Sequence, residues 1–535
     1  MTMESHAGAG RPWIRGLQIA AIALAVLVLG LTILFLIREG TWVEPRERSP
    51  QEAFLYGSTG CEIMPLPVFQ VLPDLFPEHF QPGGPAAGDW VQQFGFIPGR
   101  PDVNEGLPVG FAVSHYRPRS GSPSPVAFVG ANCSLCHTSL IRRTPEDPGV
   151  IVHGMGSTSL DFIAWVDAVR SAILDEKRFT PAIIADAYER KTGKALGFGD
   201  KVMIRAWLSN ARDRAKANLP KVDAPYGGAD LRNASLLPNG PSRTQPFRNL
   251  VRNILDRPAA NDRAFGKFPA LYEQKNRTWG QFDGTVHDRV TRSVLAALAV
   301  GATLDNLVMP DITHNVQHSI EYSLDLKGPS YAALFGPQGF KIDAAKAERG
   351  KTLYMRSCAG CHGSRAADGS WSKGKAQGVV FAADRLGTDP ERVNFRYYDT
   401  LADTLYAYFP AKHALRPKRE DLRPGPAGRT RGYISYPLEA VFSRAPFFHN
   451  GSVLTLAEVI NLEPRRELFY RGDTLYDPVK VGLAAPPAPD RRNYFRFDTR
   501  EHGNSNRGHD YPWAYQGPGW DPKALEDLLE YLKTL

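Results

Sequence analysis

The stretch CSLCH at residues 133–137 determines how this chain folds, and its pattern returns as CAGCH at residues 358–362. In each pentapeptide two cysteines are separated by two residues, and a histidine follows directly. This spacing is the attachment signature of c-type haem. Two thiols form thioether bonds with the haem, and the adjacent histidine binds the iron from the proximal side. The sequence therefore predicts two covalently bound haem groups, held by Cys133, Cys136, His137, Cys358, Cys361 and His362.

Two other uses of paired cysteines are less compatible with the sequence. A four-cysteine zinc site would use both pairs but would give no role to His137 and His362. A redox-active disulfide of the thioredoxin type lies at a strand-to-helix turn in a βαβ unit, and neither flank has that pattern. The fifth cysteine, Cys61, is expected to be a small buried side chain, with a reactive thiol as the alternative.

The N-terminal region contains an uncharged apolar run over residues 17–37. About 20 such residues cross a bilayer as a helix, so the run predicts a single transmembrane anchor behind a short cytoplasmic leader, residues 1–16. A cleaved signal peptide is the alternative, but no Ala-x-Ala site follows the run. Arg11 and Arg15 precede the run. Because positively charged residues flanking a membrane helix tend to stay on the cytoplasmic side, the N-terminus is expected in the cytoplasm. The expected location is the inner membrane, with the haem domains on the periplasmic side, where c-type haem is attached.

The remainder of the chain divides into a tether and two domains. Residues 38–50 form the tether, residues 51–325 an N-terminal haem c domain, and residues 326–535 a C-terminal cytochrome c domain. The 49 glycines and 43 prolines favour long ordered loops. The expected fold is therefore mainly α with long irregular loops, in two cytochrome c-like domains. Lys and Arg exceed Asp and Glu by 64 to 56 without a basic stripe, which argues against nucleic acid and fits a redox partner protein.

Hydrophobic periodicity locates several helices. Apolar residues recur every three or four positions from Leu160 to Ile173, and a second helix is expected over residues 289–302. Asp343 can cap a helix that places Gly350 and Tyr354 on one face and leads to Cys358. Asp521-Pro522 is a start signal for a closing helix with a leucine stripe.

Phrases along the chain resemble the dihaem bacterial cytochrome c peroxidase superfamily, and within it the rubber-oxygenase-like branch. They surround the haem motifs and extend over most of the chain outside the apolar run. The phrases are YGSTG (56–60), VLP (71–73), FPE (76–78), LPVG (107–110), VGAN (129–132), APFFHNGSV (445–453), YDPVKVG (476–482) and GNSN (503–506).

This resemblance implies roles for two further residues. His449, in the His-Asn-Gly-Ser segment, would be the distal ligand of the second haem. Trp279, in Arg277-Thr278-Trp279-Gly280, would be the aromatic that relays electrons between the haems. The family follows that tryptophan with Pro-Gly-Arg, whereas residues 281–283 here are Gln-Phe-Asp. The superfamily also contains a calcium ion, for which this sequence has no locating motif.

The resulting functional hypothesis is an oxidoreductase. The first haem would act on peroxide or dioxygen, and the second would relay electrons. The alternatives are a non-catalytic dihaem electron carrier in a periplasmic redox chain and a haem-based sensor. A second ligand on the first haem, such as Met64, Met155 or Met309, would favour the carrier. No catalytic acid or base is assigned, because His153, His287, His314, His318 and Glu321 are candidates by residue type alone.

Overall fold

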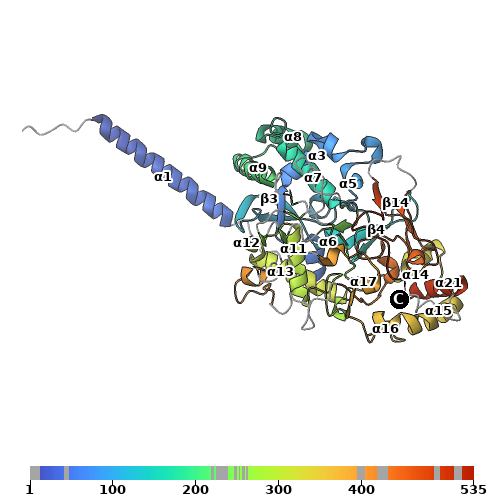
Figure 1. Ribbon diagram of the computed structural model, residues 1–535. Helices are drawn as coiled ribbons and strands as arrows, with labels where there is room; N and C mark the ends of the chain where they lie inside the picture. Colours follow the sequence, from blue (N-terminus) through green and yellow to red (C-terminus); the bar gives the residue numbers. More distant parts are fainter. Residues whose placement is uncertain are drawn as a thin grey trace, which may run out of the picture.

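The computed structural model describes most of the 535-residue chain. The described residues are 12–40, 47–218, 222–223, 239–245, 250–251, 254–255, 259–260, 263–394, 404–418, 432–486, 494–510 and 521–535. Figure 1 shows one long helix standing away from a body of helices and short strands.

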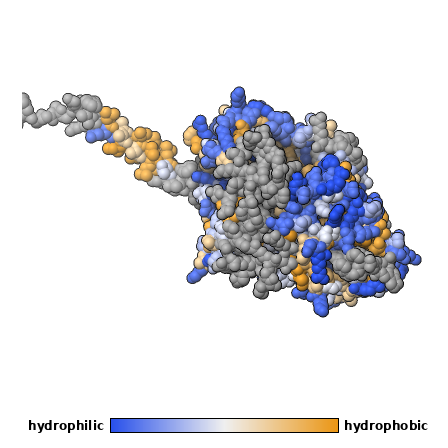
Figure 2. Space-filling view, viewed as in Figure 1, coloured by the Kyte–Doolittle hydropathy of each residue, from blue (hydrophilic) through white to orange (hydrophobic). Residues whose placement is uncertain are grey.

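That long helix is α1 (Pro12–Gly40), and its apolar surface stands clear of the body (Figure 2). The predicted transmembrane helix over residues 17–37 is nevertheless wrong for the part of the chain that the structure describes, where no helix has the length and apolarity to cross a membrane.

A three-stranded antiparallel sheet forms the centre of the N-terminal part. Its order is β1 (Cys61–Pro65), β3 (Pro123–Ala131), β2 (Phe111–Tyr116). The central strand β3 carries the β-branched and aromatic residues that favour strands. This sheet is one correction to the mainly-α expectation, because the described residues also contain seven two-stranded sheets.

The helices of the N-terminal part pack around this sheet. The segment predicted to be helical from Leu160 to Ile173 is α7 (Phe162–Leu174), capped by Asp161. The helix expected over 289–302 is α11 (Arg289–Val300), capped by Asp288. The others are α2 (Pro50–Tyr56), α3 (Leu66–Leu75), α4 (Pro77–Phe80), α5 (Trp90–Gln93), α8 (Pro181–Thr192), α9 (Phe198–Asn218), α12 (Leu304–Leu307) and α13 (Pro310–Asp325).

The C-terminal part contains the helix pair that the sequence predicts. Asp343 caps α15 (Ala344–Ser357), Asp521 caps α21 (Pro522–Leu532), and the two helices lie together in Figure 1. They cross at Gly350, where an added Cβ would lie 1.9 Å from the carbonyl oxygen of Asp527. Short helices and paired strands complete this part: α14 (Tyr331–Phe335), α17 (Ala383–Leu386), α19 (Leu456–Val459), β10 (Ser364–Arg365) with β11 (Trp371–Ser372), β12 (Val380–Ala382) with β13 (Gly432–Ile434), β14 (Leu468–Arg471) with β17 (Phe495–Asp498), and β15 (Tyr476–Asp477) with β16 (Gly482–Leu483).

The described residues form two large hydrophobic clusters and one small one, and the second large cluster draws on both parts of the chain. It combines residues between 331 and 535 with Ala270, Tyr272, Ile141, Val152 and Met155, of which the last three lie in or beside the hairpin of β4 (Thr138–Ile141) and β5 (Val150–His153). Two further strand pairs are described, β6 (Val222–Asp223) with β8 (Ala259–Ala260) and β7 (Arg243–Thr244) with β9 (Gly266–Lys267).

Lys267, at the end of β9, also joins the two parts. Its backbone N–H donates to the carbonyl of His449 at 2.7 Å, and its ammonium donates to the carbonyls of Arg444 and Pro446. Burial, with the nearby charge of Arg444, lowers the pKa of Lys267 to about 7. This lysine therefore holds the segment 444–449 in place, and the burial of its ammonium group costs free energy.

A valine at Gly350 is expected to destabilise the C-terminal helix pair. The α15–α21 crossing has no room for a Cβ against backbone, and overpacking of this kind costs about 1–3 kcal/mol. Thermal unfolding of G350V should show a lower midpoint than the parent. G199V is the matched control, because Gly199 lies in the helix α9 and no atom lies within 4 Å of an added Cβ there. Equal midpoints for G350V and the parent would contradict this account of the crossing.

Lys267 is expected to make stability depend on pH. Its folded pKa is lowered from 10.5 to about 7, so between these values the unfolded chain binds a proton that the folded chain does not. Stability therefore rises with pH across this window, by up to about 1.4 kcal/mol per pH unit from this group. The K267M variant lacks this contribution. As pH rises from 7 to 10.5, the unfolding midpoint of the parent should increase relative to that of K267M. A difference between the two midpoints that stays constant would show that Lys267 does not titrate in this pH range.

Candidate functional site

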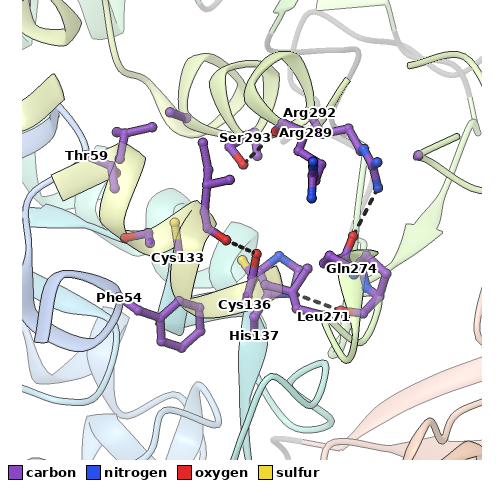
Figure 3. Close-up of a pocket in the computed structure, with 18 of the residues that line it drawn as sticks. Phe54, Thr59, Cys133, Cys136, His137, Leu271, Gln274, Arg289, Arg292 and Ser293 are labelled. Carbon is purple, nitrogen blue, oxygen red and sulfur yellow. Dashed lines mark hydrogen bonds between the residues drawn. The ribbon is translucent and has the colours of Figure 1, made fainter. Parts of the chain in front are cut away.

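A cavity lies between the first cysteine motif and the helices α11 and α13. The space between these elements has an empty volume of about 1160 Å³, part of it open to solvent. Figure 3 shows Cys136 and His137 on one side and Arg289, Arg292 and Ser293 of α11 on the other. Both thiols of the motif and the imidazole of His137 line this space.

Local structure explains how the motif reaches the cavity. The sequence before it lacks a helical period and forms β3, which ends at Ala131. Asn132 then caps the one-turn helix α6 (Cys133–His137) by accepting from the backbone N–H of Ser134. The N–H groups of Gly154 and Ser157 donate to the carbonyls of His137 and Cys136. The motif is therefore fixed at the end of the central strand.

The imidazole of His137 is prepared to bind a metal. Its Nδ1 lies 2.8 Å from the carbonyl oxygen of Pro269 and donates to it, which leaves Nε2 as the atom with a free lone pair. Burial lowers the pKa of His137 to about 4. The ring is therefore neutral at ordinary pH, the form in which histidine ligates iron.

The cavity is cationic. Arg277, Arg289 and Arg292 line it, and no Asp or Glu does among the residues that the structure describes. Nε of Arg277 and Nε2 of Gln274 are buried there with no hydrogen-bond partner, and burial lowers the pKa of Arg277 to about 10. Unpartnered buried donors are costly, so these two point to acceptors that a bound group would supply.

These observations fit a haem. The two thiols and the imidazole match its attachment and its iron, and the arginines and Gln274 match its two carboxylates. The described lining contains neither a methionine nor a histidine besides His137, and apart from the motif itself its side chains of a kind that binds haem iron are Cys61 and Tyr436. Cys61 is engaged by Thr59 and by the carbonyl of Ala297, and burial raises its pKa to about 12. Met64, Met155 and Met309 lie outside the lining.

The second motif is built in the same way from different segments. Cys358 ends α15 and the short helix α16 (Ala359–His362) follows. Nδ1 of His362 donates to the carbonyl oxygen of Tyr436 at 2.7 Å, and burial lowers the pKa of His362. The same preparation of Nε2 is therefore present at both motifs.

His509 lies opposite His362, and the sequence interpretation missed it. Their ring centroids are 6.2 Å apart, and burial lowers the pKa of His509 to about 3. The signal was close at hand, because the phrase at residues 503–506 continues directly into Arg507-Gly508-His509. The distance of His509 from the motif along the chain gives no reason to pair it with His362 without the fold.

His449, predicted as the distal ligand of the second haem, has other neighbours. Its Nε2 lies 3.0 Å from the hydroxyl of Tyr433, and the two rings stack with centroids 4.2 Å apart. The Tyr433 hydroxyl donates to the carbonyl of Asp389. Burial lowers the pKa of His449 well below its usual value. The ligand role of His449 stays a prediction.

Trp279 is half-buried, and its ring packs edge-on against His287 with centroids 4.9 Å apart. It does not line the cavity, although Arg277, Gly280, Gln281 and Phe282 do. Its relay role stays a prediction. The departure from the family pattern at residues 281–283 ends in Asp283, which forms a buried ion pair with Arg392 at 3.7 Å.

The acid and base candidates lie elsewhere. None of His153, His287, His314, His318 and Glu321 lines the cavity. Within the described ranges, no cluster of three or more His, Cys, Asp or Glu side chains is arranged to hold a metal ion. The possible calcium ion is therefore not placed by these residues.

Comparison with known proteins connects the C-terminal region to a family. A family model described as "RoxA-like, cytochrome c-like" matches residues 432–470. A Sinorhizobium fredii protein named "Uncharacterized protein y4iJ" is 25% identical over 579 residues, covering 92% of this chain and 93% of that protein. A second protein of that organism, "Uncharacterized protein y4iM", is 29% identical over 301 residues, covering 50% of this chain and 63% of the relative. The family match relates the chain to RoxA-like cytochromes c and supports a c-type cytochrome that binds haem iron and transfers electrons.

Proposed function

We propose that this protein is a dihaem c-type cytochrome whose first haem reacts with a small oxidant, peroxide or dioxygen, and whose second haem relays electrons to it. The observation that supports this is the cavity at residues 133–137. Arg289, Arg292 and Ser293 face the motif across it (Figure 3), and the described lining contains no methionine and no histidine besides His137 that could bind the iron from the other side. A haem held there keeps one position for a substrate.

The residues of the first site would have distinct tasks. Cys133 and Cys136 would carry the haem, and His137 would bind the iron while Pro269 holds its ring through Nδ1. Arg277 and Gln274 would bind the haem carboxylates with their unpartnered donors. Ala297 and Val300 exclude water from part of the cavity wall. When bound, haem supplies one-electron chemistry and an iron that takes oxygen species.

The second site would bind haem through Cys358, Cys361 and His362, with His509 as the sixth ligand. An imidazole nitrogen binds a transition metal at about 2 Å, so two imidazoles on opposite sides of one ion have ring centroids about 6 Å apart. The His362–His509 separation of 6.2 Å agrees with this. A haem held by both histidines would supply electron storage and transfer at this site.

The proposal carries two further consequences for the cellular setting. Electrons reaching the second haem require a redox partner protein, and the formal net charge of +8 favours an acidic one. Attachment of c-type haem places the haem-binding body outside the cytoplasm.

The EPR spectrum of the ferric full-length protein, matured with two haems, tests the function. We expect one high-spin signal from the open site and one low-spin signal from the six-coordinate site. The paired variants separate the two: C133A/C136A should lose the high-spin signal and C358A/C361A the low-spin signal. Two low-spin signals would favour the non-catalytic electron carrier. A protein that carries one haem or none after maturation would refute the dihaem proposal.

Replacing His509 with alanine is expected to leave one ligand position on the iron of the second haem vacant. In H509A the low-spin EPR signal should convert to high-spin, and added imidazole should restore it because the ligand position is then vacant. H449A is the matched comparison, since His449 is also a histidine whose pKa is strongly lowered by burial, and it should keep the low-spin signal. If the low-spin signal converts to high-spin in H449A and is retained in H509A, the iron ligand is His449 and not His509.

A further inference from the structure

One residue touches both candidate haem sites. The carbonyl oxygen of Tyr436 accepts the hydrogen bond from Nδ1 of His362 at 2.7 Å. The half-buried ring of the same tyrosine lines the first cavity, together with His137 and Arg277. Only the bonds within a single residue separate the wall of the first site from the proximal histidine of the second.

The ring of Tyr436 is held firmly. Its hydroxyl donates to the carbonyl oxygen of Gln281, and the guanidinium of Arg277 lies 4.9 Å from the ring centroid. Phe282 packs edge-on against it at 6.3 Å. Burial raises the pKa of Tyr436 to about 12, so the phenol keeps its proton at ordinary pH.

Trp279 lacks these connections. Its ring packs on His287, an exposed residue, and does not line the cavity. The structure therefore offers a tyrosine in contact with both sites and a tryptophan in contact with neither His137 nor His362 among its described ring contacts.

We propose that Tyr436 is the residue through which electrons pass between the two haems, and that its carbonyl positions His362 for this transfer. The inference rests on the proposed function, because it requires both haems. One electron leaves the ferrous iron of the second site and reduces the ferric iron of the first. The tyrosine keeps its phenol proton and undergoes no net oxidation, and no covalent bond forms or breaks.

The test measures electron redistribution inside the haem-loaded protein, not turnover. A flash-generated reductant supplies less than one electron per ferric molecule, and absorbance follows how fast the electron equilibrates between the high-spin and low-spin haems. Y436L removes the ring and keeps the carbonyl, and it should lower the equilibration rate below that of the parent, because the aromatic group between the two sites is lost. Y436F, which keeps the ring, should equilibrate at close to the parent rate. W279L is the matched control and should also stay close to the parent.

The outcomes separate this inference from the proposed function. Haem content and the two EPR signals are measured first, and their failure concerns the proposed function alone. An unchanged low-spin signal in Y436L shows that His362 keeps its place, so that a slower rate reports the ring. A parent-like rate in Y436L, or a slow rate confined to W279L, would overturn the role of Tyr436. If Y436L does not load both haems, Y436M takes its place under the same criteria, because methionine adapts to irregular space.

Discussion

The hydrogen bond from Nδ1 of each motif histidine to a distant backbone carbonyl is the constraint on which both sites depend. His137 reaches Pro269, 132 residues away, and His362 reaches Tyr436, 74 residues away. The helices α6 and α16 are a single turn each and cannot orient an imidazole by themselves. The carbonyls fix the ring plane and the tautomer, so the loops that carry Pro269 and Tyr436 determine how the two motif histidines are oriented.

Buried cations are the second theme of the structure. Arg243, Lys267, Arg277 and Arg471 all have pKa values lowered by burial. Most of them donate to backbone carbonyls: Arg471 to Gly451 and Pro241, and Arg243 to Asn239 while its guanidinium lies over Phe265. Arg277 differs, because its Nε has no such acceptor and it lines the cavity. A bound carboxylate could accept from this Nε–H group and would therefore offset the free-energy cost of burying it without an acceptor.

Sequence reasoning succeeded where the signal is local. The caps at Asp343 and Asp521, the crossing glycine Gly350 and the apolar face of α7 all depend on residues close together in the chain, and all are confirmed. It failed where the determinants are distant. The strand β3 is stabilised by pairing with β1 and β2 on both sides, which no local period reveals. His509 and Tyr436 gain their significance only from the fold, which brings each of them to His362.

The hairpin of β4 and β5 follows the first motif directly, yet Ile141 and Val152 belong to the core that surrounds the second. Arg142 extends this connection by donating its N–H to Thr474 and accepting from Tyr476. The hairpin therefore connects the two halves of the molecule through packed side chains and backbone hydrogen bonds. The separation of the two motif histidines is then set by packed side chains, not by a linker.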